Sequence, residues 1–178
     1  MESYTIIILI FGLLITFLLI CLYFINQILQ YKIKIDNSFI AVEELLVNLD
    51  DYLEEILEFL KKNKENERTL FLELSKAKDL IKTVKNNAEG INTIKKIEAK
   101  LELFYMLENT YKSFNKNKEY LKLKEKLLKF KDKLIYAMDI YDKGVIEYNN
   151  YTKKKYIYIL SRILNFKEYN CYNKDYDI

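Results

Sequence analysis

The chain has 178 residues, with no proline, histidine or tryptophan and only three glycines. So few turn-forming residues argue against a many-stranded β fold, whereas abundant lysine, glutamate and leucine favour long helices. The 29 basic and 26 acidic residues give a formal net charge of +3, too balanced to indicate nucleic-acid binding.

The first predicted element is a membrane-spanning helix. Residues 5–25 read TIIILIFGLLITFLLICLYFI and contain no charged side chain. At 1.5 Å per residue this helix would be about 32 Å long, enough to cross the hydrocarbon core of a bilayer. No basic residue precedes the segment, its apolar run exceeds that of a signal peptide, and no A-x-A cleavage site follows it. We therefore expect an uncleaved anchor.

The charges that flank the segment predict its orientation. Glu2 precedes the apolar run, whereas Lys32 and Lys34 follow it closely. Because basic residues favour the cytoplasmic side, we expect the N-terminus outside and the rest of the chain in the cytoplasm.

Three amphipathic helices are predicted next, over residues 37–62, 67–85 and 91–114, because apolar residues recur at steps of three and four. Gly90, in the connection NNAEG, is expected to adopt a left-handed turn conformation. The inward residues are predicted to be Leu46, Leu49, Leu53, Ile56 and Leu60 in the first helix; Leu70, Leu74, Ala77, Ile81 and Val84 in the second; and Ile94, Ile97, Leu101, Phe104 and Tyr111 in the third.

The longest predicted helix covers residues 118–149 and carries a seven-residue repeat, the pattern of a coiled-coil seam. One row of the seam is Tyr120, Leu127, Leu134, Tyr141 and Tyr148, and the other is Leu123, Phe130, Ala137 and Gly144. Its place in the seam predicts that Gly144 faces inward, although a glycine within a helix costs about 1 kcal/mol relative to alanine. The missing side chain would let another helix approach closely or leave room for a bulky partner such as tyrosine. A short amphipathic helix within KKYIYILSRILNFKEY, residues 154–169, should follow.

These elements predict an all-α fold, in which an N-terminal transmembrane helix is followed by an antiparallel up-down four-helix bundle with a short C-terminal helix. The expected division is an anchor over residues 1–31, a bundle domain over 32–172 and a polar tail over 173–178. No proline or glycine lies between Phe24 and Leu46, which leaves open whether the anchor and the first bundle helix are continuous.

Residues for catalysis or metal binding are poorly represented. The absence of histidine excludes the Glu-x-x-His pairs of diiron bundles, and Cys21 and Cys171 are too isolated for a CxxC motif or a typical zinc site. The three glycines lie singly, so no phosphate-binding loop is present. We expect no catalytic, cofactor-binding or metal-binding residue, and hence a protein that is not an enzyme.

Two charged clusters are candidate binding sites. The acidic run Asp50, Asp51, Glu54 and Glu55 could receive a basic partner or a divalent ion, although such runs on amphipathic helices are usually solvated faces. The basic residues Lys153, Lys154, Lys155 and Arg162 alternate with apolar residues and could face lipid in an interfacial helix. The alternative for this second cluster is a helix that caps the end of the bundle.

The second half of the chain resembles the LemA family of bacterial single-pass membrane proteins. Residues 111–150 read YKSFNKNKEYLKLKEKLLKFKDKLIYAMDIYDKGVIEYNN, which is similar to the family block that ends in a Tyr-Asn-x-x-Val-x-x-Tyr-Asn pattern. The matching positions are Tyr111, Asn117, Tyr120, Leu123, Leu127, Tyr141, Val145, Tyr148 and Asn149. The departures include Lys112 in place of the family's proline, Met138 and Asp139 in place of its basic pair, and Asp142 in place of its first asparagine.

Two further segments extend the resemblance to about residues 36–172. Residues 46–61, LVNLDDYLEEILEFLK, are similar to the first cytoplasmic helix of the family, although Asn48 and Leu49 replace its arginine pair and Glu54 and Glu55 replace its proline-asparagine pair. The C-terminal ILSRILNFKEY resembles the family's closing helix, with Asn165 in place of a glycine.

The resemblance implies a helical bundle held at a bacterial cell membrane, in a family with no agreed biochemical activity. Some relatives take part in building membrane-bounded organelles, and others occur beside a membrane metalloprotease. We therefore expect a scaffold or adaptor that contacts lipid through its N-terminal helix and binds another membrane-associated protein, with no nucleic acid and no small-molecule substrate. The alternatives are a lipid-interacting protein that shapes the membrane and an accessory regulator of a membrane protease, and homo-oligomerisation is left open.

Overall fold

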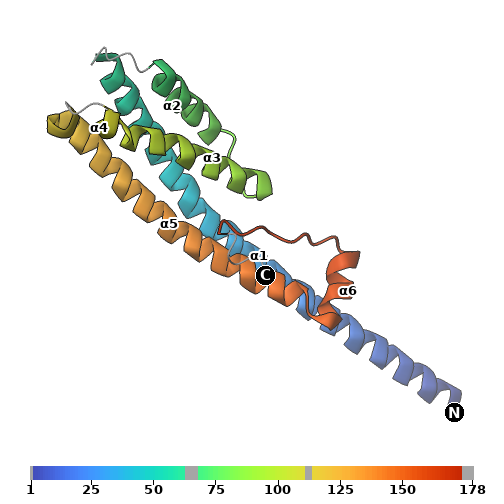
Figure 1. Cartoon of the computed structure of the whole chain (residues 1–178). Helices are drawn as coiled ribbons and strands as arrows, with labels where there is room; N and C mark the ends of the chain where they lie inside the picture. Colours follow the sequence, from blue (N-terminus) through green and yellow to red (C-terminus); the bar gives the residue numbers. More distant parts are fainter. Residues whose placement is uncertain (1, 63–67, 111–113, 174–178) are drawn as a thin grey trace.

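The computed structural model of the chain describes residues 2–62, 68–110 and 114–173, and these residues form helices and connections without any strand (Figure 1). The predicted all-α class is confirmed. The elements are α1 (Glu2–Lys62), α2 (Arg68–Ile81), α3 (Ala88–Tyr105), α4 (Leu107–Thr110), the 3₁₀ turn η1 (Phe114–Lys116), α5 (Lys118–Thr152) and α6 (Lys155–Ile163).

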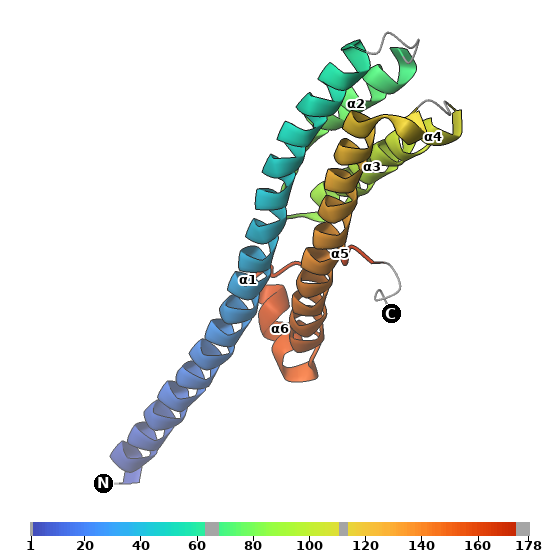
Figure 2. The same ribbon diagram turned by 90° about the vertical axis from the view of Figure 1, so that its left-hand side faces the viewer.

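Helix α1 joins the apolar N-terminal segment to the first helix of the core without a break. It contains 61 residues, and its N-terminal part projects beyond all the other elements (Figure 2). Residues 4–20 are exposed all round, whereas Ile28 and Ile35 begin a buried face that continues to Leu60. The question left open by the sequence is thereby answered: one rod carries both the apolar segment and the first core stripe.

Helix α5 lies beside α1 and runs in the opposite direction (Figures 1 and 2). Residues nearer the start of α1 contact residues nearer the end of α5, and the reverse also holds. Lys34 forms an ion pair with Glu147 at 2.6 Å, and Glu55 forms one with Lys126 at 2.5 Å. Both predicted rows of the α5 seam are buried, as are the stripe residues of α1. This antiparallel pair forms the longest part of the hydrophobic core.

Helices α2 and α3 cover only part of the α1–α5 pair, because they have 14 and 18 residues against 35 in α5 (Figure 2). On α2, Lys78 reaches back to Glu54 of α1 at 3.1 Å. Glu73 of α2 bonds Lys100 of α3, so these two helices also contact each other. The predicted inward residues Leu70, Leu74 and Ala77 on α2, and Ile94, Ile97, Leu101 and Phe104 on α3, are buried in the same core.

Two helix ends were predicted too far along the chain. Helix α2 stops at Ile81 rather than near residue 85, and α3 ends at Tyr105 rather than continuing to residue 114. At Met106 the chain leaves the α3 pattern before the short helix α4 begins. Tyr111, predicted to face inward, lies outside the described residues.

Gly90 was also assigned the wrong conformation. It does not adopt a positive φ angle but lies in the first turn of α3, where its backbone N–H donates to Oδ1 of the N-cap residue Asn87 at 2.8 Å. A Cβ atom at this position would lie 1.7 Å from the carbonyl oxygen of Lys85, so glycine is needed for close approach of the backbone. Among the described residues other than glycine, the left-handed conformation occurs at Asn165, with φ of 55°.

Asn165 ends α6 in a Schellman motif. Its N–H donates to the Arg162 carbonyl oxygen at 3.2 Å, and the Phe166 N–H donates to that of Ser161 at 2.9 Å. After glycine, asparagine is the residue that best tolerates a left-handed conformation at this position. This explains how Asn165 can replace the glycine of the family pattern and still turn the chain back toward α5.

Gly144 faces the neighbouring helix, as its place in the seam predicts. The residue is buried, and a Cβ built there would lie 3.4 Å from Cγ1 of Ile35 on α1. One methyl group can therefore be accommodated at ordinary contact distance, whereas a longer side chain would collide with Ile35. The position limits the separation of α1 and α5 at this level of the pair.

We expect Gly144→Leu to destabilise the fold by about 1–3 kcal/mol through overpacking. Gly144→Ala should be neutral or stabilising by up to about 1 kcal/mol, because it gains helix propensity without a clash. Chemical unfolding of the detergent-solubilised chain, followed by circular dichroism, measures both. A leucine variant as stable as the wild type would contradict the placement of Gly144 against Ile35.

Candidate functional site

The candidate site is built around the segment that follows α6, residues 164–173, here called the strap. After the turn at Asn165 the strap runs back along α5 toward α3 (Figure 1). It has no regular secondary structure, so its backbone polar groups need partners from elsewhere in the chain. α5 supplies several of these partners, and two of the residues that do so lie seven positions apart.

Asn149 and Asp142 hold the strap by its backbone. The Asn149 side-chain amide donates to the Tyr169 carbonyl oxygen at 2.8 Å and accepts from the Tyr169 N–H at 3.2 Å. Two helical turns earlier, the Asp142 carboxylate accepts the N–H groups of Tyr172 and Asn173 at 2.6 and 2.9 Å. Because residues seven apart lie on one face of a helix, the two side chains form a ladder along which the strap is fixed.

The tyrosine that precedes each of these residues belongs to the core. Tyr148 is buried, packs edge-to-face on Tyr169 with ring centroids 5.2 Å apart, and donates its hydroxyl to the Lys167 carbonyl oxygen at 3.1 Å. Burial raises the pKa of Tyr148 to about 12. Tyr141 packs against Phe39 of α1, and its buried hydroxyl has no hydrogen-bond partner among the described residues. Of these two buried tyrosines, Tyr148 thus has a hydroxyl that is hydrogen-bonded within the described part of the chain, and Tyr141 does not.

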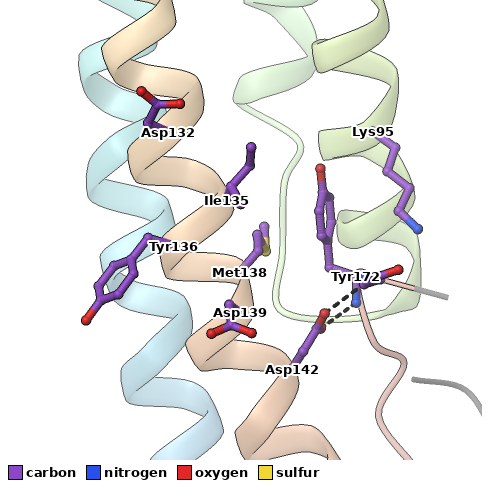
Figure 3. Close-up of a pocket in the computed structure, with 9 residues that line it drawn as sticks. Lys95, Asp132, Ile135, Tyr136, Met138, Asp139, Asp142 and Tyr172 are labelled. Carbon is purple, nitrogen blue, oxygen red and sulfur yellow. Dashed lines mark hydrogen bonds between the residues drawn. The ribbon is translucent and has the colours of Figure 1, made fainter. Parts of the chain in front are cut away.

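A recess of about 710 Å³ opens between α5, the beginning of α3 and the end of the strap (Figure 3). Its polar lining includes Asp132, Asp139 and Asp142 from α5 and Lys95 from α3. Ile135 and Met138 supply apolar surface between the aspartates (Figure 3). The recess therefore combines more acidic than basic side chains with an apolar floor formed by Ile135 and Met138.

Tyr172 closes one side of the recess and connects the strap to α3. Its hydroxyl donates to the Glu98 carboxylate, and Lys95 Nζ lies 5.2 Å from the centre of its ring. Desolvation raises the pKa of Glu98 above its ordinary value, although the bond from Tyr172 opposes the shift. Desolvation likewise raises the pKa of Asp142, against the two backbone N–H groups that favour its charged form.

The arrangement suits recognition of a basic or amide-bearing segment. Carboxylates that line an open recess can accept hydrogen bonds from lysine, arginine or backbone N–H groups, and the apolar floor can bury the stem of a long side chain. Among the described residues, no group of three or more potential metal-ligating side chains comes together. The expectation that the chain has no catalytic or metal-binding residues stays a prediction.

The acidic run predicted as a partner site does not form one surface in the structure. Asp50 and Glu54 face α2, where Lys78 lies 3.7 and 3.1 Å from their carboxylates. Glu55 faces α5 and pairs with Lys126, while Asp51 is exposed. Three of the four carboxylates thus link α1 to its neighbours, and their role in binding a partner stays a prediction.

Three residues of the basic cluster lie where α5 passes into α6, and the fourth, Arg162, lies near the end of α6. Lys153 is 3.4 Å from Glu168, and Lys154 lies over the Tyr151 ring at 5.1 Å. Lys155 and Arg162 are exposed and lie seven residues apart on α6, so they share one face of that helix. The predicted contact of these four residues with lipid is taken up below.

Sequence reasoning missed the ladder that holds the strap. A usable signal was present, because Tyr141-Asp142 and Tyr148-Asn149 repeat the same pair of residue types at a spacing of seven. The tyrosines were assigned to the core, but the polar residue beside each was not given a partner. At both of these positions the polar residue bonds the backbone of a segment that crosses the helix.

The fold and the site define a class: all-helical proteins in which one long helix carries an exposed apolar segment and also supplies a stripe of the core. The sequence model of the LemA family matches residues 38–177, and the chain belongs to this family. No curated protein shows significant sequence similarity to the chain. The matched range begins within α1, beyond the apolar segment, and includes the ladder and the strap.

We expect Asn149→Ala to loosen the strap without unfolding the core. Loss of a hydrogen bond worth about 1 kcal/mol should speed amide exchange at Tyr169 by about fivefold. The neighbouring Asn150→Ala, at an exposed position, is the matched control and should leave this exchange rate unchanged. Hydrogen–deuterium exchange with site resolution makes the measurement, and equal rates in both variants would contradict the ladder.

Asp142→Asn should change the pH dependence of stability. Burial raises the pKa of Asp142 in the folded state. Ionisation of this group therefore lowers the free energy of unfolding as the pH rises from about 4, the ordinary pKa, through the folded pKa. The variant cannot ionise there, although it loses an acceptor for one strap N–H at every pH. We therefore expect the free energy of unfolding of the wild type, minus that of the variant, to fall with rising pH and then level off. Parallel curves would contradict a raised pKa at Asp142.

Proposed function

We propose that this LemA-family protein is a membrane-anchored, non-enzymatic scaffold that binds another membrane-associated protein. The single observation that carries the proposal is the uninterrupted helix α1. Its residues 4–20 expose apolar side chains all round, and the same rod then forms one wall of the core. A partner bound to the core would thereby be held at a fixed place relative to the bilayer.

The anchor is proposed to cross the membrane once. α1 is long and apolar enough to span a bilayer, and its apolar stretch ends before Lys32 and Lys34. If these basic residues lie on the cytoplasmic side, the N-terminus would lie outside a bacterial cell membrane and the core in the cytoplasm. We further propose that α1, α2, α3 and α5 behave as one antiparallel four-helix bundle, as their ion pairs and shared core support.

The recess beside the strap is our candidate for the partner-binding surface. Asp132, Asp139 and the apolar Ile135 are presented together, and Ile135 is 50% exposed. A single exposed apolar residue on a helix is ordinary, but one placed between carboxylates in a recess gives a partner both burial and charge. A basic segment of a membrane-associated protein has the complementary chemistry.

Site-specific photocrosslinking in native membranes tests the proposal. Ile135 is replaced by p-benzoylphenylalanine, and Leu121 serves as the control because it lies on the same row of α5, about 21 Å away, and is 43% exposed. We expect a discrete protein adduct from position 135 that is absent from position 121. The adduct should disappear when Asp132→Lys and Asp139→Lys are combined. Adducts to lipid only, or the same adducts from both positions, would contradict a protein partner at the recess.

A further inference from the structure

We propose that α6 lies flat on the surface of the bilayer that α1 crosses. In this arrangement Tyr156, Ile159 and Ile163 enter the boundary between headgroups and acyl chains, and Lys155 and Arg162 contact anionic headgroups. The inference rests on the proposed anchor and adds a second membrane contact, which would fix how far the core stands from the bilayer and which side of it faces the lipid.

The distribution of side chains around α6 gives the first argument. Ile157 and Ser161, four residues apart, are buried against the rest of the molecule. Tyr156, Ile159 and Ile163 recur at steps of three and four, and they are 62%, 65% and 74% exposed. A helix that served only to cap the core would bury its apolar residues on the core side. α6 instead carries a second apolar stripe that the described part of the chain leaves mostly exposed.

The place of α6 along α1 gives the second argument. Tyr156 packs on Phe24 of α1, with ring centroids 5.5 Å apart. Counted from Tyr4, a hydrocarbon core about 30 Å thick would end near Tyr23, because 20 residues of helix span that distance. The beginning of α6 therefore meets α1 where the bilayer would end. Figure 1 shows α6 turned away from the common direction of α1 and α5, as a helix lying along the membrane surface would be.

The exposed stripe of α6 continues the apolar surface of the anchor. Tyr23 and Phe24 form an edge-to-face pair on α1, and Phe24 in turn contacts Tyr156, so aromatic rings join the two surfaces. Tyrosine is enriched at the boundary between a membrane and water, because its ring can be buried while its hydroxyl stays hydrated. This continuity favours the bilayer over a protein partner as the occupant of the stripe.

The charges beside the stripe complement an anionic bilayer. Lys155 and Arg162 lie on one face of α6 next to the apolar stripe, and Lys32 is exposed on α1 just beyond the expected end of the span. Two acidic residues of the segments that flank α6, Glu147 and Glu168, pair with Lys34 and Lys153. A helix with an apolar stripe flanked by basic residues is typical of interfacial membrane binding.

Spin-label accessibility in the full chain tests the inference. The native Cys21 and Cys171 are replaced by alanine, and single cysteines are introduced in turn at Leu14, Ile159 and Leu121. Each labelled protein is reconstituted into vesicles of phosphatidylglycerol and phosphatidylcholine, and collision with oxygen is compared with collision with a water-soluble nickel chelate. We expect Leu14 to report the bilayer interior, Leu121 the aqueous phase, and Ile159 a shallow depth between them.

The outcomes distinguish a failure of the inference about α6 from a failure of the proposed anchor. If Leu14 is in the bilayer while Ile159 is as accessible to nickel as Leu121, the inference is wrong and the anchor stands. If Leu14 is also aqueous, both proposals fail. In the combined variant Lys155→Glu and Arg162→Glu, we expect the label at Ile159 to move toward water while that at Leu14 stays in place. An unchanged depth at Ile159 would overturn the role of the two basic residues.

Discussion

The structure depends on the antiparallel pairing of α1 with α5. α1 continues past its exposed apolar segment because the next residues replace a surface that is apolar all round with a stripe that packs on α5. The seven-residue rows of α5 maintain that contact over its whole length, and the small residue Gly144 lets it close onto Ile35. The rigidity of the pair would transmit the position of the anchor to the core.

The strap explains why polar residues interrupt the pattern of α5. Asp142, which is buried, and Asn149, which is partly buried, serve as acceptors and donors for backbone that would otherwise lack partners close to the core. Holding the strap also determines the place of α6, because the strap leads from the end of that helix and its far end is tied to α3 through Tyr172 and Glu98. One ladder therefore connects both features to which we assign function, the recess and the exposed stripe of α6.

Much of the fold could be predicted because the apolar residues that form its core recur at regular spacings in the sequence. Heptads and three-four steps identified the buried rows, and the place of Gly144 in its row showed its direction. Helix ends were less predictable, since Met106 and Ile81 have no proline or capping glycine beside them. The conformations of Gly90 and Asn165 could not be inferred because they depend on local approach of the backbone, at Lys85 and at the end of α6. The recess could not be predicted because it is lined by α3, α5 and the strap, whose relative positions are set only by tertiary packing.

The continuity of α1 is tested most directly by a distance measured between two labels on the same helix. Leu14 and Val47 are both exposed, 33 positions apart (47 − 14), one in the apolar segment and one beside the core. With the native cysteines replaced and spin labels at these two positions, double electron–electron resonance on the membrane-reconstituted chain should give a single narrow distance of about 50 Å, since a straight helix rises 1.5 Å per residue. A broad distribution, or one centred well below that distance, would show a hinge between the apolar segment and the core and would contradict the account.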